Sequence, residues 1–114
     1  MPAPAKISFL RDDSATPVVL HMSGPLVMAT IGDFQNQLRG ETAPSVVLDF
    51  GEVPFIDSSG LGSMISIYLH FKQTGRKLAV VGMNEKCRAL VKMTNVENIF
   101  PNFASVEAAR AALA

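Results

Sequence analysis

Apolar residues along this chain form short continuous runs in some places and helically spaced positions in others. The runs at 45–50 and 77–82 are almost entirely apolar, which is typical of strands buried on both faces of a parallel sheet. The segment at 58–74 between them has helical spacing and ends at Gly75. The order predicts one βαβ unit. Its two strands should be parallel neighbours, because such crossovers are right-handed in nearly all proteins.

Two further elements are predicted before this unit. Residues 6–11 and 17–22 should form strands, and the Asp-Asp-Ser-Ala stretch between them supplies turn-forming residues. An antiparallel hairpin therefore opens the domain. Next along the chain, Thr30 and Asp33 have the spacing of a capping box at the start of a helix that ends at Gly40. This helix returns the chain to the start of the first buried run.

Two helices and one short strand are predicted after the second buried run. Asn84 can cap a helix on which Cys87, Leu90 and Val91 share a face, and Ser105 can cap a last helix. The short strand and the last helix are expected at about 100–103 and 106–113. No repeat or linker divides the sequence, and its length suits one hydrophobic core, so we expect a single domain over residues 1–114.

The turn between the first buried strand and its helix has the most informative chemistry in the chain. The helix begins at Asp57 or Ser58, where the first backbone N–H groups have no acceptor within the helix. Those groups and the positive end of the helix dipole favour a phosphate. A serine here is therefore well placed to be phosphorylated. Repulsion between the phosphate and Asp57 would make the two states of this site differ sharply, as in a switch.

A purely structural explanation of this turn is that Asp57 or Ser58 only caps the helix. Gly60 and Gly62 favour a functional explanation, because each glycine disfavours a helix by about 1 kcal/mol relative to alanine. Positions without a side chain let another backbone approach closely, which suits docking of a partner protein. The predicted partner-binding residues are Asp57, Ser58, Ser59, Gly60, Leu61 and Gly62, with Ser58 as the predicted phosphoacceptor.

The helix after the turn is more apolar than one sheet face can cover. Leu61, Met64, Ile65, Tyr68 and Leu69 fall within one arc at about 100° per residue, and Ile67 and Phe71 widen that arc to roughly 200°. Two interpretations are open. Neighbouring helices could bury the excess, or part of the arc could be an exposed patch for a partner.

Composition and charge narrow the possible functions. The ten basic and ten acidic residues cancel, and the only basic cluster lies at 72–77, so the positive surface of a nucleic-acid-binding protein is missing. The N-terminus lacks a signal-peptide pattern, and no apolar run approaches the ~20 residues needed to cross a bilayer. Cys87 is the only cysteine and fits a reducing compartment. We expect a cytoplasmic protein without membrane insertion or nucleic-acid partners.

The sequence offers no complete catalytic or metal site. His21 and His70 have no second histidine or cysteine at metal-ligand spacing. The turn at Ser58 differs from the Gly-x-Ser-x-Gly elbow, and no lysine follows its glycines as a phosphate loop requires. We therefore expect no catalytic residue, metal or cofactor, and an enzyme with Ser58 as nucleophile is the least favoured hypothesis. Cys87 is expected to be a small buried residue. Core gaps should be filled by Met22, Met28, Met64, Met83 and Met93.

These residues together resemble the STAS domain family, named for sulfate transporters and anti-sigma factor antagonists, and within it the free-standing bacterial antagonists. The similarity is strongest over Val46-Val47-Leu48-Asp49-Phe50 and Phe55-Ile56-Asp57-Ser58-Ser59-Gly60-Leu61-Gly62. It continues through Gly75-Arg76-Lys77-Leu78 and Leu90-Val91-Lys92-Met93. The resemblance implies the STAS fold, an α/β fold with a mixed four- to five-stranded sheet and about four helices packed mainly on one side.

The resemblance also implies a function. In the antagonist branch, the unphosphorylated protein binds an anti-sigma factor that is also a serine kinase, and so frees its sigma factor. The kinase modifies the serine that follows the motif aspartate, here Ser58, and a PP2C-type phosphatase reverses the modification. The alternative within the family is a constitutive scaffold subunit of a stress-signalling or lipid-transport complex. This chain departs from the common Gly-x-Leu-Asp pattern before the first helix, because Gly24-Pro25-Leu26 is followed by Val27.

Overall fold

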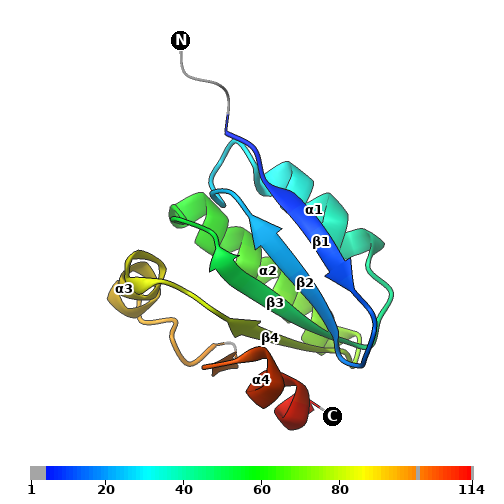
Figure 1. Ribbon diagram of the computed structural model, residues 1–114. Helices are drawn as coiled ribbons and strands as arrows, with labels where there is room; N and C mark the ends of the chain where they lie inside the picture. The colour runs from blue at the N-terminus through cyan, green and yellow to red at the C-terminus, as the bar shows by residue number, and fades with distance from the viewer. Residues whose placement is uncertain (1–4, 100, 114) are drawn as a thin grey trace.

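The computed structural model describes residues 5–99 and 101–113, and within them it contains one five-stranded mixed sheet in the order β1-β2-β3-β4-β5 (Figure 1). The first strand pairs antiparallel with the second, and the remaining neighbours are parallel. The strands are β1 (Ser8–Asp12), β2 (Val18–Ser23), β3 (Ser45–Glu52), β4 (Lys77–Val81) and β5 (Asn102–Phe103). The helices are α1 (Ile31–Gly40), α2 (Ser58–Gln73), α3 (Glu85–Met93) and α4 (Val106–Leu113).

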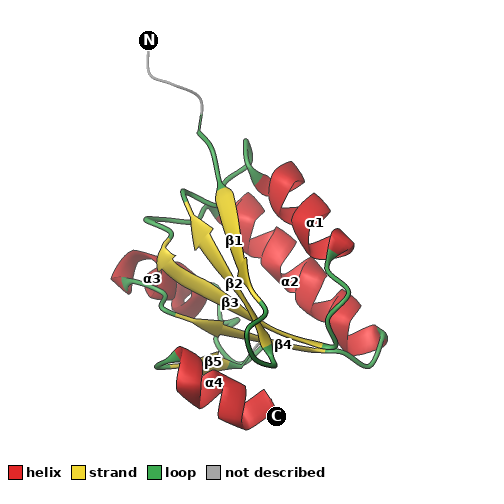
Figure 2. Cartoon of the chain, turned by 45° about the vertical axis from the view of Figure 1, so that its right-hand side comes forward, coloured by secondary structure: helices red, strands yellow, loops and turns green. Residues whose placement is uncertain are grey.

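Helices cover both faces of this sheet unequally. Successive strand residues point to opposite faces. On one face, Leu48 and Phe50 of β3 join a large core to which α1, α2 and α3 contribute. On the other face, Val47 of β3 and Val81 of β4 pack in a smaller core with Ala109 of α4. Figure 2 shows α1 and α2 on one side of the sheet and α4 on the other. The predicted α/β fold, with a mixed sheet and helices mainly on one side, is confirmed.

The predicted order of elements is also confirmed. β3 and β4 are parallel neighbours, with Val46 opposite Leu78, so the βαβ unit forms as expected. Asn84 caps α3 by accepting a hydrogen bond from the backbone N–H of Cys87 at 2.9 Å. Ser105 Oγ accepts one from the N–H of Ala108 at 3.1 Å, at the start of α4. Of the strand predicted at 100–103, residue 100 lies outside the described residues.

The capping box predicted at the start of α1 is wrong. Thr30 occupies the N-cap position, but its side chain makes no capping hydrogen bond. Its hydroxyl accepts a hydrogen bond from the N–H of Val27 at 2.9 Å and donates one to the carbonyl of Pro25 at 2.8 Å. The Thr30 side chain is buried and holds the loop that precedes α1, so it is not available to the helix end.

The apolar arc of α2 is mostly buried by the rest of the fold, and a partner for its exposed part stays a prediction. The core-facing positions are Gly60, Leu61, Ser63, Met64, Ile67 and Phe71. Ile65 and Tyr68 are half-buried against the same core. Leu69 is 46% exposed. Neighbouring elements therefore bury most of the arc, and only its Leu69 side presents apolar surface. Among residues 5–99 and 101–113, no helix is both long and apolar enough to span a membrane.

The expectation for sulfur-containing residues is correct for some and wrong for others. Met22, Met64 and Met83 are buried as predicted. Met28 and Met93 are 71% and 75% exposed, because each lies where the chain leaves the packed layers, one in a loop and one at the end of α3. Cys87 is fully buried, as expected, and burial raises the pKa of its thiol, which therefore stays protonated.

A buried carboxylate follows α1. Glu41 accepts two hydrogen bonds from the Arg11 guanidinium, at 2.7 Å and 3.1 Å, and a third from the N–H of Ala43 at 3.0 Å. The hydrogen bond from Arg11 is the main cause that lowers the pKa of Glu41 below its ordinary value. The pair ties the edge strand β1 to the segment between α1 and β3.

This pair predicts how stability depends on pH. Because the pKa of Glu41 is lower in the folded state, its contribution is present above the unfolded value, about 4.3, and is lost as pH falls through the folded value. Glu41→Gln should lower the free energy of unfolding by about 1 to 2 kcal/mol at pH 7, and by less at pH 3.5. Urea unfolding measures both. The exposed Glu52→Gln is the control, and an equal loss in both variants at both pH values would contradict this role.

Candidate functional site

The predicted serine turn lies beyond the carboxyl end of β3, where the chain enters α2 (Figure 1). The N–H of Val53 donates to the carbonyl of Phe50 at 2.9 Å and turns the chain out of the strand. Asp57 then occupies the N-cap position, and Ser58 is the first helical residue. Ser58 is solvent-exposed, so its hydroxyl is open to a modifying enzyme.

Asp57 fixes the geometry of this turn. Its Oδ1 accepts a hydrogen bond from the N–H of Gly60 at 2.7 Å, which caps α2. Its Oδ2 accepts one from the N–H of Met28 at 3.1 Å. The cap is therefore Asp57 and not Ser58. Ser58 Oγ has no hydrogen-bond partner among residues 5–99 and 101–113, so the hydroxyl is not needed to hold the turn.

A second segment runs alongside the turn and supports it. The N–H of Leu26 donates to the carbonyl of Phe55, and the N–H of Asp57 donates to the carbonyl of Leu26, both at 3.2 Å. Leu26 and Ile56 form a parallel bridge, and both side chains are buried. The loop that precedes α1 and the loop that precedes α2 are thereby joined into one surface.

This contact explains Gly60. A Cβ atom at that position would lie 2.0 Å from the carbonyl oxygen of Leu26, so no residue with a side chain fits there. The explanation offered from the sequence, close approach by a partner backbone, is wrong for Gly60, because the approaching backbone belongs to the same chain. Gly62 differs, since it is exposed and a Cβ there would meet nothing within 4 Å.

The predicted partner-binding residues are placed unequally. Ser58 and Gly62 are exposed, and Asp57 and Ser59 are half-buried. Gly60 and Leu61 are buried and face the core. The last two therefore position the turn, and only the exposed and half-buried members present atoms to a partner. Their part in binding stays a prediction.

Two exposed apolar residues lie beside the turn and were not among the binding residues predicted from the sequence. Met28 is 71% exposed and Phe55 is 46% exposed, and they lie on the two joined loops that flank Asp57. Their position outside any periodic segment was the available signal, because neither a helix nor a strand could bury them. Residues 24–38 and 53–66 contain no lysine or arginine. The turn thus combines an exposed serine with an apolar rim, on two loops that themselves contain no lysine or arginine.

Neither histidine approaches Ser58. His21 Nδ1 lies 2.6 Å from Asp49 Oδ2, on the sheet face opposite α2. His70 lies twelve residues along α2, which is about 18 Å along the helix axis. The pair of His21 and Asp49 was missed, because only the register of β2 and β3 places these residues opposite each other. No group of three metal-ligating side chains occurs in the part of the chain that the structure describes.

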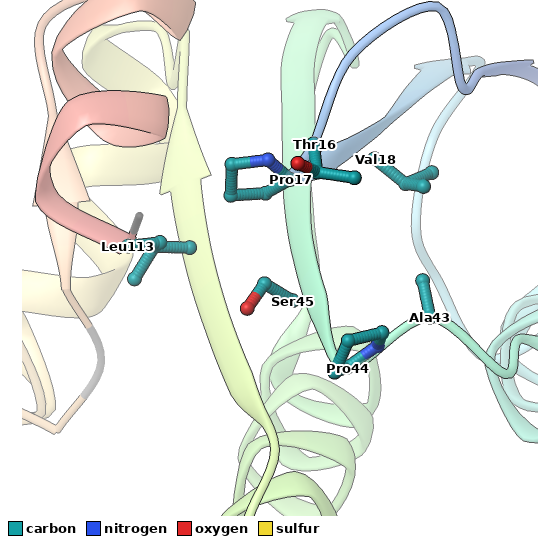
Figure 3. A pocket seen from close by; sticks show the side chains of 7 residues that line it. All are labelled: Thr16, Pro17, Val18, Ala43, Pro44, Ser45 and Leu113. Atoms are coloured by element: carbon teal, nitrogen blue, oxygen red, sulfur yellow. The ribbon is translucent and has the colours of Figure 1, made fainter.

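A cavity of about 270 Å³ lies at the opposite end of the sheet, at the amino ends of β2 and β3. Figure 3 shows Leu113 of α4 across this cavity from Pro17 and Ser45. Its lining residues are Thr16, Pro17, Val18, Ala43, Pro44, Ser45 and Leu113. None of them is charged, so the cavity offers no ionic contact to a ligand.

Comparison with known proteins agrees with this geometry. A crystal structure of an anti-sigma factor antagonist from Mycobacterium paratuberculosis is similar at 26% identity and a TM-score of 0.83, over 99% of this chain and 98% of that chain. The antagonist SpoIIAA shares the fold at 14% identity: its unphosphorylated form has a TM-score of 0.69, over 89% of this chain and 92% of that chain. The phosphorylated form from Bacillus has a TM-score of 0.66, over 89% and 96%. A family model described as STAS domain matches residues 7–109, and the chain therefore belongs to the STAS domain family.

Proposed function

We propose that this protein is an anti-sigma factor antagonist that docks through the Ser58 turn and is switched by phosphorylation of Ser58. Unmodified, it binds an anti-sigma factor with serine kinase activity and frees the sigma factor. Phosphorylation ends binding, and a PP2C-type phosphatase restores it. The observation that carries the proposal is the exposed Ser58 hydroxyl at the first residue of α2, in a turn that Asp57 already caps. The similarity to anti-sigma factor antagonists supports it.

Electrostatics supports the switch. A phosphoserine carries about −1.5 to −2 charges at neutral pH. Asp57 cannot turn away from that charge without losing its hydrogen bonds to the N–H groups of Gly60 and Met28. Neither loop supplies a lysine or arginine to neutralise it. A partner that fits the unmodified turn would have to desolvate the phosphate without a matching cation, which opposes binding.

The apolar rim supplies binding energy in this proposal. Met28 and Phe55 present apolar surface on either side of the turn. Exposed apolar residues beside polar groups are typical of the central part of a protein interface. Burial of these two side chains against the partner would stabilise the complex, while Ser58 decides whether the complex forms.

Capture of partners from the source cells tests the proposed function. The purified protein, immobilised without ATP, should retain an anti-sigma factor with a kinase domain. Addition of ATP and Mg²⁺ should release that partner and leave a phosphate on Ser58, which mass spectrometry locates. Release of the partner without phosphate transfer, or a phosphate on another residue, would overturn the switch.

A variant in the rim and a matched control outside it test the contribution of the rim to binding. Met28 and Met93 are similarly exposed, but only Met28 lies beside the turn. Met28→Ser should weaken binding of the captured partner about tenfold, which corresponds to about 1.4 kcal/mol, and Met93→Ser should leave the affinity unchanged. Titration calorimetry measures both. Equal affinities of the two variants would place the docking surface elsewhere.

A constitutive scaffold subunit of a signalling or lipid-transport complex is the second candidate. The observation that favours it is Val27, which stands where family members commonly have an acidic residue before α1. In a scaffold, Ser58 would dock without modification. Mass spectrometry of the protein isolated from cells separates the two, because a phosphate on Ser58 in a large fraction of the molecules excludes a purely constitutive role.

A further inference from the structure

Two adjoining cavities lie between α3 and the carboxyl ends of β4 and β5, at the side of the sheet where Figure 1 shows α3. The first has a volume of about 240 Å³ and is lined by Met83, Arg88, Val91, Lys92, Glu97 and Asn102. The second has a volume of about 350 Å³ and is lined by Gly82, Met83, Arg88, Asn102, Phe103 and Ala104. Met83, Arg88 and Asn102 line both, so the two form one cleft, which we call the α3 cleft. Their volumes lie near the lower limit of small-molecule sites, about 300 Å³.

The charge in the α3 cleft is not balanced. Arg88 and Lys92 are four residues apart on α3, so they lie on the same face of the helix, where like charges repel. Neither forms an ion pair with any residue in the described ranges. Glu97 lines the same cavity but pairs with neither cation. The cleft therefore keeps a net positive charge at its rim, which favours an anion.

The first of the two cavities has a mainly apolar lining, and the second has a mainly polar one. Met83 and Val91 are buried core residues whose remaining surface forms the wall of the first cavity. A methionine wall adapts to an apolar group of irregular shape, because its side chain is flexible and polarizable. An apolar wall next to a guanidinium selects a ligand with both characters. A carboxylate can accept two parallel hydrogen bonds from such a guanidinium.

We propose that the α3 cleft binds a small amphiphilic carboxylate. The acid group lies at Arg88 and Lys92, and the apolar tail lies against Met83 and Val91. The site is separate from the Ser58 turn and does not depend on the proposed switch. It does lie on an element that supports the turn, because Asn84 at the start of α3 donates a hydrogen bond to the carbonyl of Pro54 at 2.8 Å.

Titration of the isotope-labelled protein with octanoate, followed by methyl and amide NMR spectra, tests this site. Octanoate should shift the methyl resonances of Met83 and Val91 saturably. Octanol, which lacks the charge, and acetate, which lacks the tail, should each bind at least about tenfold more weakly. Saturable shifts at Met28 instead, no saturable shift at all, or equal binding of octanoate and octanol would overturn the proposal.

Variants locate the charge contribution. Arg88→Gln with Lys92→Gln should weaken octanoate binding at least about tenfold, while Lys86→Gln, on the same helix but outside the cleft lining, should change it less than about twofold. Unchanged binding in the double variant would overturn the site. The comparison of octanoate with octanol on the unaltered protein needs no variant, so it decides the question even where the double variant folds poorly.

Discussion

Gly60→Ala is expected to lower the free energy of unfolding by about 3 kcal/mol. The added Cβ would lie 2.0 Å from the carbonyl oxygen of Leu26, which is backbone and cannot rotate away as a flexible side chain could. Relief of this clash requires the loop before α1 to separate from α2. That movement would also strain the hydrogen bond from the Asp57 N–H to the Leu26 carbonyl and the Asp57 cap on Gly60.

Gly62→Ala is the matched control for this prediction. Gly62 lies two residues further along the same helix, is exposed, and has open space where a Cβ would stand. Alanine there should stabilise the protein by about 0.5 to 1 kcal/mol, because it favours the helix and restricts the unfolded chain. Urea unfolding of both variants gives the comparison. A Gly60→Ala protein as stable as the Gly62→Ala protein would contradict the packing of Leu26 against α2.

Ser58→Asp should weaken binding of the anti-sigma factor more than a hundredfold, which corresponds to roughly 3 kcal/mol. The added carboxylate would lie beside Asp57, and the two joined loops contain no lysine or arginine to neutralise it. Ser58→Ala should bind within about threefold of the unaltered protein, since a loss of that size is under 1 kcal/mol. The alanine variant should also accept no phosphate at the turn. These expectations depend on the proposed function.

Ser66→Asp controls for the general effect of an added charge on α2. Ser66 is exposed on the same helix, eight residues and about 12 Å further from the turn. The Ser66→Asp variant should bind the anti-sigma factor with the same affinity as the unaltered protein. Equal weakening by Ser58→Asp and Ser66→Asp would show that net charge, and not the position of the charge, controls binding. Equal affinities of Ser58→Asp and Ser58→Ala would remove the switch.

The fold could be predicted from the sequence because its signals are local and repeated. Apolar runs at β3 and β4, with a helical pattern ending at Gly75 between them, leave few arrangements other than a parallel βαβ unit. The caps at Asn84 and Ser105 depend on contacts within three residues, so they too were predictable. Burial of Cys87 followed from its place on the apolar face of α3.

Features that depend on contacts between distant segments could not be predicted. Thr30 was expected to cap α1, but its hydroxyl is used by the loop before the helix, which no local pattern reveals. Gly60 was assigned to a partner because the sequence does not show that Leu26 approaches it. The exposure of Met28 has the same cause, since its loop is held in place by Asp57, twenty-nine residues away. The motif therefore predicts the position of the site in the chain, but not the contacts between segments that shape it.

The affinity of the phosphorylated protein for its captured partner tests the central claim most directly. The protein should be phosphorylated by that partner, purified with one phosphate on Ser58, and compared with the unmodified protein by titration calorimetry without ATP. The account predicts an affinity at least about a hundredfold lower for the phosphorylated form, restored by a PP2C-type phosphatase. Equal affinities of the two forms would contradict it.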